Sequence, residues 1–248
     1  MDLNLQFENF KKLTDELVQK YTSDDIYFFL RNSEHILPVG DIWYAQLKQK
    51  NFKAANLYLQ LLKAYTVRAL YDVISKGILA GKINLESLTQ HLKEKSWLGQ
   101  KFEISGFDWI ELLSPALGQF LADLKMEIES NGENPVRYYL AIDSLGIKFE
   151  GLLREVSRIS GAAVHEKKLF QSERLFSIVE LLENKALETT YSKEDVAFLK
   201  ALFTEHGLDL SNNLGRCYFQ NSNYTLGTML LLFFALLRVG NLRFTQPE

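Results

Sequence analysis

Three polar residues near the C-terminus, Ser211, Asn212 and Arg216, have the side chains to bind an anion. Amide and guanidinium groups each donate several hydrogen bonds, so they can hold a phosphate or a carboxylate. Arg216 stays protonated at physiological pH and therefore cannot act as a general base. We take these residues as a candidate anion-binding or RNA-binding group. The alternative is a loop or helix start in which Asn212 bonds the local backbone.

A second polar group lies on a long amphipathic segment. Asp143, Glu150 and Arg154 fall close to one stripe of a helix predicted over residues 136–160. Glu150 and Arg154 are four residues apart, which is the spacing of an intrahelical ion pair. This stripe can line a pocket opposite Arg216, and a solvated helix face explains it equally well.

The histidines do not form a recognisable site. Arg31 and His35 lie four residues apart, and we interpret them as the surface end of a helix before a proline. His91, His165 and His206 are scattered and lack the spacing of a zinc site. The sequence also contains no phosphate-binding loop, dinucleotide motif or nucleophile elbow. We predict no metal, no cofactor and no catalytic residue.

The composition is that of an ordinary globular protein, with 47% apolar and 24% charged residues among 248. The formal net charge of −3 argues against a dedicated DNA-binding protein. A single cysteine, Cys217, cannot form an intrachain disulfide, so we expect a reducing, cytoplasmic setting. The apolar run Tyr224–Leu237 is shorter than the roughly 20 residues that cross a bilayer. We predict a buried helix there and no membrane association.

Hydrophobic periodicity near 3.6 residues predicts an all-α, multi-helix bundle. The segments expected to form helices after residue 84 are Leu85–Lys95, Phe107–Ser130, Val136–Ser160, Ser172–Glu183, Ser192–Glu205 and Tyr224–Leu237. Pro115 is expected to kink or restart the second of these, and Ser192 with Asp195 has the spacing of a capping box. Residues 161–168 are expected to form a loop. A boundary near residue 104 would separate an N-terminal helical region, 1–104, from a C-terminal unit, 105–248, and the two can pack as one globular unit.

Three segments, in order, resemble HEPN-type helical domains. They are FDWIELLSPALGQFL at Phe107–Leu121, YYLAIDSLGIKFEGLLREVSRISG at Tyr138–Gly161, and the run Phe198–Gly240. The resemblance is closest to a branch whose motif reads NLRNxxAHG directly before a long leucine-rich helix. It covers roughly residues 105–243 and implies a HEPN-like C-terminal unit with additional N-terminal helices.

In active HEPN ribonucleases, the Arg and His of the motif cleave RNA without a metal, usually across a homodimer. In this chain the motif's Arg falls on Ser211, its Asn on Asn212, its small residue on Gly215, its His on Arg216 and its Gly on Cys217. The resemblance therefore implies a catalytically degenerate protein that acts as a binding or assembly module. It also implies a homodimer with RNA, a nucleotide or a protein as partner, in the setting of prokaryotic defence or toxin–antitoxin systems.

Two alternatives remain open at the level of sequence. One is a metal-independent RNA-cleaving enzyme that uses Arg216 and Asn212 with His206, or with Arg31 and His35 brought near by folding. The other is a helical scaffold without a ligand.

Overall fold

The structure is a computed structural model that describes residues 67–68, 70–100, 106–131, 133, 136–167, 173–184, 187, 190–205 and 207–244. Residues 1–66 of the predicted N-terminal helical region, which include the pair Arg31 and His35, lie outside the described residues, as does His206.

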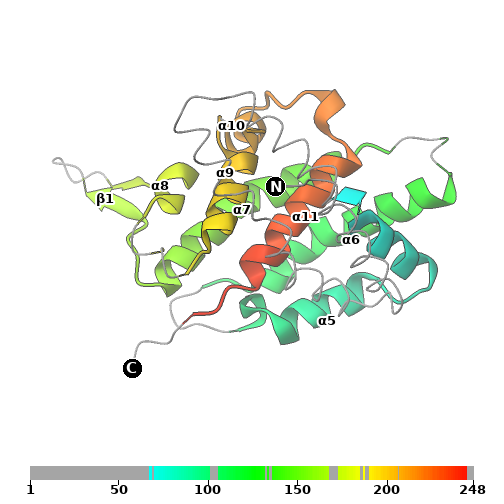
Figure 1. The fold of residues 1–248 in the computed structure, drawn as a ribbon, viewed down its shortest axis with the longest axis horizontal. Coiled ribbons are helices and arrows are strands. Elements are labelled where there is room, and N and C mark those ends of the chain that lie inside the picture. The colour runs from blue at the N-terminus through cyan, green and yellow to red at the C-terminus, as the bar shows by residue number, and fades with distance from the viewer. Residues whose placement is uncertain are drawn as a thin grey trace, which may run out of the picture.

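Helices carry the described part of the chain, which confirms the all-α prediction (Figure 1). Residues 70–79 are helical. The remaining elements, in chain order, are α5 (Leu85–Lys95), the 3-10 helix η2 (Trp97–Gly99), α6 (Trp109–Glu129), α7 (Tyr139–Ile159), β1 (His165–Lys167), β2 (Glu173–Leu175), α8 (Ile178–Leu182), α9 (Lys193–Phe203), α10 (Leu210–Gly215), the 3-10 helix η4 (Asn221–Asn223) and α11 (Leu226–Gly240).

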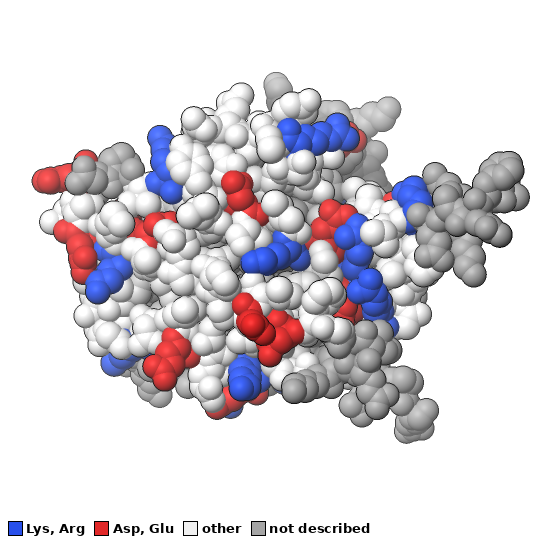
Figure 2. Space-filling view, turned by 180° about the vertical axis from the view of Figure 1, so that it is seen from behind, with Lys and Arg blue, Asp and Glu red and all other residues white. Residues whose placement is uncertain are grey.

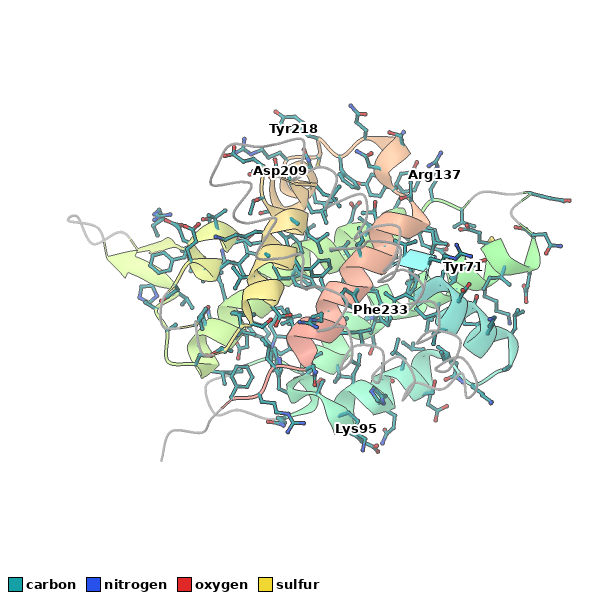
Figure 3. The ribbon with its side chains drawn as sticks, viewed as in Figure 1. Tyr71, Lys95, Arg137, Asp209, Tyr218 and Phe233 are labelled. Atoms are coloured by element: carbon teal, nitrogen blue, oxygen red, sulfur yellow. The ribbon has the colours of Figure 1, made fainter. Side chains whose placement is uncertain are left out.

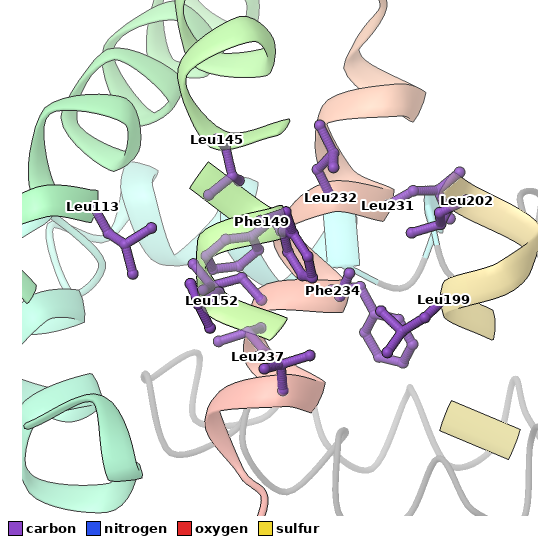
Figure 4. Close-up of a cluster of buried hydrophobic side chains, with 14 of the residues drawn as sticks. Leu113, Leu145, Phe149, Leu152, Leu199, Leu202, Leu231, Leu232, Phe234 and Leu237 are labelled. Atoms are coloured by element: carbon purple, nitrogen blue, oxygen red, sulfur yellow. The ribbon is translucent and has the colours of Figure 1, made fainter. Parts of the chain in front are cut away.

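The leucine-rich helix α11 lies in the middle of the bundle. Every residue from Thr228 to Gly240 is buried, and Figure 1 shows α11 crossing the middle of the bundle beside α9. Phe233 packs against Phe120 of α6, with ring centroids 5.4 Å apart, and Phe234 packs edge-on against Phe198 of α9 at 5.2 Å. Figure 4 shows leucine and phenylalanine side chains of α6, α7, α9 and α11 converging on this core. The apolar run before residue 240 is therefore a core helix, as predicted.

Helix α7 presents its predicted apolar seam to the same core. The sequence predicts a seam of Ile142, Leu145, Phe149, Leu152, Val156 and Ile159, and the first five are fully buried while Ile159 is partly buried. Their alternating spacing of three and four residues places them on one side of the helix. The seam is thus part of the fold's interior, as its periodicity indicated.

The prediction of a helix over Ser172–Glu183 was wrong for the first half of that segment, most of which is extended. Residues 173–175 form β2, which pairs antiparallel with β1, so the loop predicted over 161–168 also contains a strand. Helix α8 begins only after Ser177, whose backbone is extended (φ −68°, ψ 165°) and whose hydroxyl caps the helix together with Glu180. An N-cap residue requires this non-helical backbone, so the helix cannot start earlier. The spacing of apolar residues predicted a helix in this segment but did not predict that Ser177 would be its N-cap.

Pro115 does not restart the helix that contains it. One helix, α6, spans Trp109–Glu129 through the proline. A proline in this position removes the amide that would bond the carbonyl of Glu111. Both Pro115 and Glu111 are exposed, so water can hydrate that carbonyl and the helix continues.

Buried contacts cross the predicted boundary near residue 104. Trp97 is buried and donates its indole N–H to the carbonyl of Val239, 2.7 Å away, at the end of α11. Leu98 lies against Gly240. Residues on both sides of position 104 therefore share one hydrophobic core, and the division into two regions stays a prediction.

Candidate functional site

The candidate anion-binding residues lie on and after α10, and a glycine of α7 brings this short helix close. A Cβ atom at Gly146 would collide with Leu214 Cδ1 of α10. Because glycine has no Cβ atom, the Leu214 side chain of α10 can lie directly against the backbone of α7 at this position. Leu214 is buried, so the outer side of α10 carries the polar residues.

Helix α10 begins at Asp209, which adopts a left-handed backbone (φ 49°). Asn212 donates its side-chain N–H to Asp209 Oδ1 at 2.9 Å. Asn213 donates its side-chain N–H to the carbonyl of Leu208 at 3.1 Å. The amide of Asn212 is thus tied to the start of its own helix through a side chain, where the sequence suggested a backbone bond.

The chain leaves α10 through a tight turn. Cys217 adopts a left-handed backbone (φ 56°), and the carbonyl of Asn213 accepts hydrogen bonds from the backbone N–H groups of Tyr218 (2.7 Å) and Phe219 (3.1 Å). A left-handed residue directly after a helix is a common helix ending, and glycine is its usual occupant. This turn leaves Arg216, Cys217 and Tyr218 exposed.

Arg216 and Ser211 differ in their surroundings. Arg216 is exposed, and its guanidinium forms no hydrogen bond or ion pair with another described residue. Ser211 is half-buried beside the exposed Asn212. Of these candidates, Arg216 is the cation that the surface leaves available to an external anion.

Asp143 joins this end of the molecule from α7. Tyr224 donates its phenolic O–H to Asp143 Oδ1 at 2.7 Å. Burial, followed by this hydrogen bond to the carboxylate, raises the pKa of Tyr224 above its usual range. The phenol therefore stays protonated as a donor, and the carboxylate that it touches is already engaged.

Glu150 and Arg154 form the predicted ion pair, but they do not join Asp143. Arg154 also donates to the carbonyl of Phe176 at 3.2 Å, which ties α7 to the segment between β2 and α8. Arg154 follows Asp143 by eleven residues, which corresponds to about 16 Å along a helix axis. The three residues therefore do not form one polar site. Asp143 binds Tyr224, whereas Glu150 and Arg154 form an ion pair farther along α7.

Aromatic side chains that sequence reasoning passed over pack around Tyr224, the partner of Asp143. The ring of Tyr139 lies 4.6 Å from that of Tyr224, and Phe219 meets Tyr224 edge-on at 4.9 Å. Tyr218 is 70% exposed and Tyr139 is 38% exposed. The sequence did not indicate this exposure, because Tyr138 and Tyr139 are adjacent and of the same type. In the fold Tyr138 is fully buried and Tyr139 is partly exposed.

We use the name tyrosine surface for four exposed residues, Arg137 and Tyr139 at the start of α7 and Arg216 and Tyr218 in the turn after α10. Arg137 is exposed just before α7, a helix whose first residues include no acidic side chain and no side-chain cap. In Figure 3, Arg137 and Tyr218 lie along the same upper edge, on either side of the start of α11. The face turned away from the viewer in Figure 1, which Figure 2 shows, carries acidic and basic side chains interspersed.

Neither described histidine lies on α7 or α10: His91 is on α5 and His165 is on β1. Among the described residues, no group of three or more histidine, cysteine, aspartate or glutamate side chains is arranged to hold a metal ion. No helix in the described part of the chain has both the length and the apolar character to cross a membrane.

By its fold, the chain is an all-α helical bundle. No protein-family model matches it, and comparisons with curated proteins and with solved structures gave no match.

Proposed function

We propose that the chain is a HEPN-like module that binds single-stranded RNA without cleaving it and acts as a homodimer. The observation that supports this most directly is that Arg216 and Tyr218, two residues apart in one turn, are both exposed, while Asp143 is engaged by Tyr224. This arrangement offers a cation and an aromatic face to a ligand. It offers no histidine among the described residues of α7 and α10 to exchange a proton during cleavage.

Single-stranded RNA matches the chemistry of the tyrosine surface. A guanidinium holds phosphate oxygens through paired hydrogen bonds. An exposed tyrosine stacks on any base, and one such contact is worth about 1–3 kcal/mol. The first turn of α7 has no side-chain cap, so its backbone N–H groups can add further donors for an anion. With a net charge of −3 for the chain, attraction to RNA has to be local.

The backbone at Cys217 supports the HEPN-like ancestry. In the motif this position is glycine, and here it adopts the left-handed conformation that favours glycine. The helix that follows, α11, is leucine-rich and buried, as the motif's following helix is expected to be. Both features are those expected of the proposed motif frame, in which Ser211 and Arg216 would stand at the positions of the two catalytic side chains.

The test is the binding of a fluorescently labelled, unstructured RNA oligonucleotide, followed by anisotropy at several salt concentrations. We expect Arg216→Ala and Tyr218→Ala each to weaken binding about tenfold, in line with about 1–3 kcal/mol per contact. Arg216→Ala should also reduce the salt dependence. Lys93→Ala on α5 removes a positive charge that is also exposed, away from this surface, and should bind as the unchanged protein does.

The outcomes separate the ligand classes. Equal affinity of all variants would contradict the assignment of the tyrosine surface. Binding of polyphosphate as tightly as RNA would show that phosphate alone is recognised. Absence of RNA binding by the unchanged protein would overturn the proposal and favour a protein partner.

Cleavage and assembly are measured on the same samples. We expect the RNA to remain intact on a denaturing gel, and cleavage that disappears in Arg216→Ala would overturn the non-catalytic part of the proposal. Light scattering at micromolar concentration should give the mass of a dimer. A monomer would contradict the homodimer and leave the RNA-binding result to be judged separately.

A further inference from the structure

We draw no further inference here: the strongest candidate, the exposed apolar stripe that Leu140 and Ile147 form on α7, carries nothing because nothing in the structure shows what covers it.

Discussion

Individual residues decide how the segment after α10 turns toward α11. Cys217 holds a left-handed backbone (φ 56°), which in a residue with a Cβ atom costs about 1–2 kcal/mol relative to an ordinary conformation. The surrounding bonds enforce it, because Asn213 accepts two backbone hydrogen bonds across the turn. The position is therefore strained in a way that sequence variants can reveal.

We predict that Cys217→Gly raises the free energy of unfolding by about 1 kcal/mol, because glycine adopts this backbone without a steric penalty. Cys217→Val should lower it by about 1–2 kcal/mol, since a β-branched residue is disfavoured there. Urea unfolding measures both. Cys217→Ser is the matched control and should change little. If Gly and Val variants unfold at the same urea concentration, the turn does not have this backbone.

At the scale of elements, helix α10 depends on the absence of a side chain at Gly146. The two helices meet where a Cβ at this position would collide with Leu214. This contact is one of those that hold α10 on α7, and α10 leads directly into the turn that contains Arg216 and Tyr218. Packing at α7 is therefore coupled to the candidate site.

We predict that Gly146→Ala displaces the Leu214 side chain at a cost of about 1–3 kcal/mol, as overpacking does, of which the better helix propensity of alanine offsets about 1 kcal/mol, and that RNA binding weakens as the packing of α10 on α7 loosens. Gly215→Ala is the matched control, since a Cβ there meets nothing within 4 Å. It should be neutral or stabilise α10 by up to about 1 kcal/mol. Adding Leu214→Ala to Gly146→Ala should restore binding if the collision is the cause, and failure to do so would contradict this explanation.

A buried ion pair connects α9 and α11. Asp195 Oδ2 accepts hydrogen bonds from the backbone N–H and hydroxyl of Ser192, which completes the predicted capping box. Asp195 Oδ1 accepts from the Arg238 guanidinium at 2.6 Å, and both side chains are about nine-tenths buried. One carboxylate thus caps a helix and neutralises a buried cation.

We predict that Asp195→Ala lowers the free energy of unfolding by about 3–5 kcal/mol, because it leaves the charge of Arg238 buried without this partner. Ser192→Ala removes only the cap and should cost about 1 kcal/mol. Chemical unfolding of both variants distinguishes the two roles. Equal losses would mean that the ion pair contributes nothing beyond the cap.

For the whole molecule, two carboxylates should give opposite dependences of stability on pH. Burial raises the pKa of Asp123, although a hydrogen bond from Gln119 partly opposes this. The protonated Asp123 side chain is therefore favoured in the folded state. Its stabilising contribution is complete below the pKa of the unfolded chain and is lost as pH rises through the pKa of the folded protein. Glu180 is the reverse case: hydrogen bonds from Arg174 and then from Ser177 lower its pKa to about 2. Its contribution is full above the unfolded pKa and is lost as pH falls toward 2.

We predict that Asp123→Asn raises the melting temperature at pH 7 and that the gain disappears near pH 3, below the unfolded pKa of aspartate at about 3.9. Glu180→Gln should lower the melting temperature at pH 7 and approach the unchanged protein near pH 2. Thermal unfolding across pH 2–8 measures the two variants side by side. The same sign for both at pH 7 would contradict this assignment of their surroundings.

The sequence by itself determined the helical class, the buried C-terminal helix and the α7 seam. Each of these follows from apolar residues that recur at helical spacing over many positions, because burial of that apolar face is favourable. The capping box of Ser192 and Asp195 and the ion pair of Glu150 and Arg154 were also predictable, because they join residues within one turn of a helix.

Only the tertiary structure decided what surrounds Arg216. The partner of Asp143 is Tyr224, 81 residues away, and no local pattern relates them. The same holds for Arg238 beside Asp195 and for the contact of Gly146 with Leu214. Burial separates Tyr138 from Tyr139, although both are tyrosines in adjacent positions. Chemistry at a surface depends on which elements meet there, and that is a property of the folded packing rather than of any one segment.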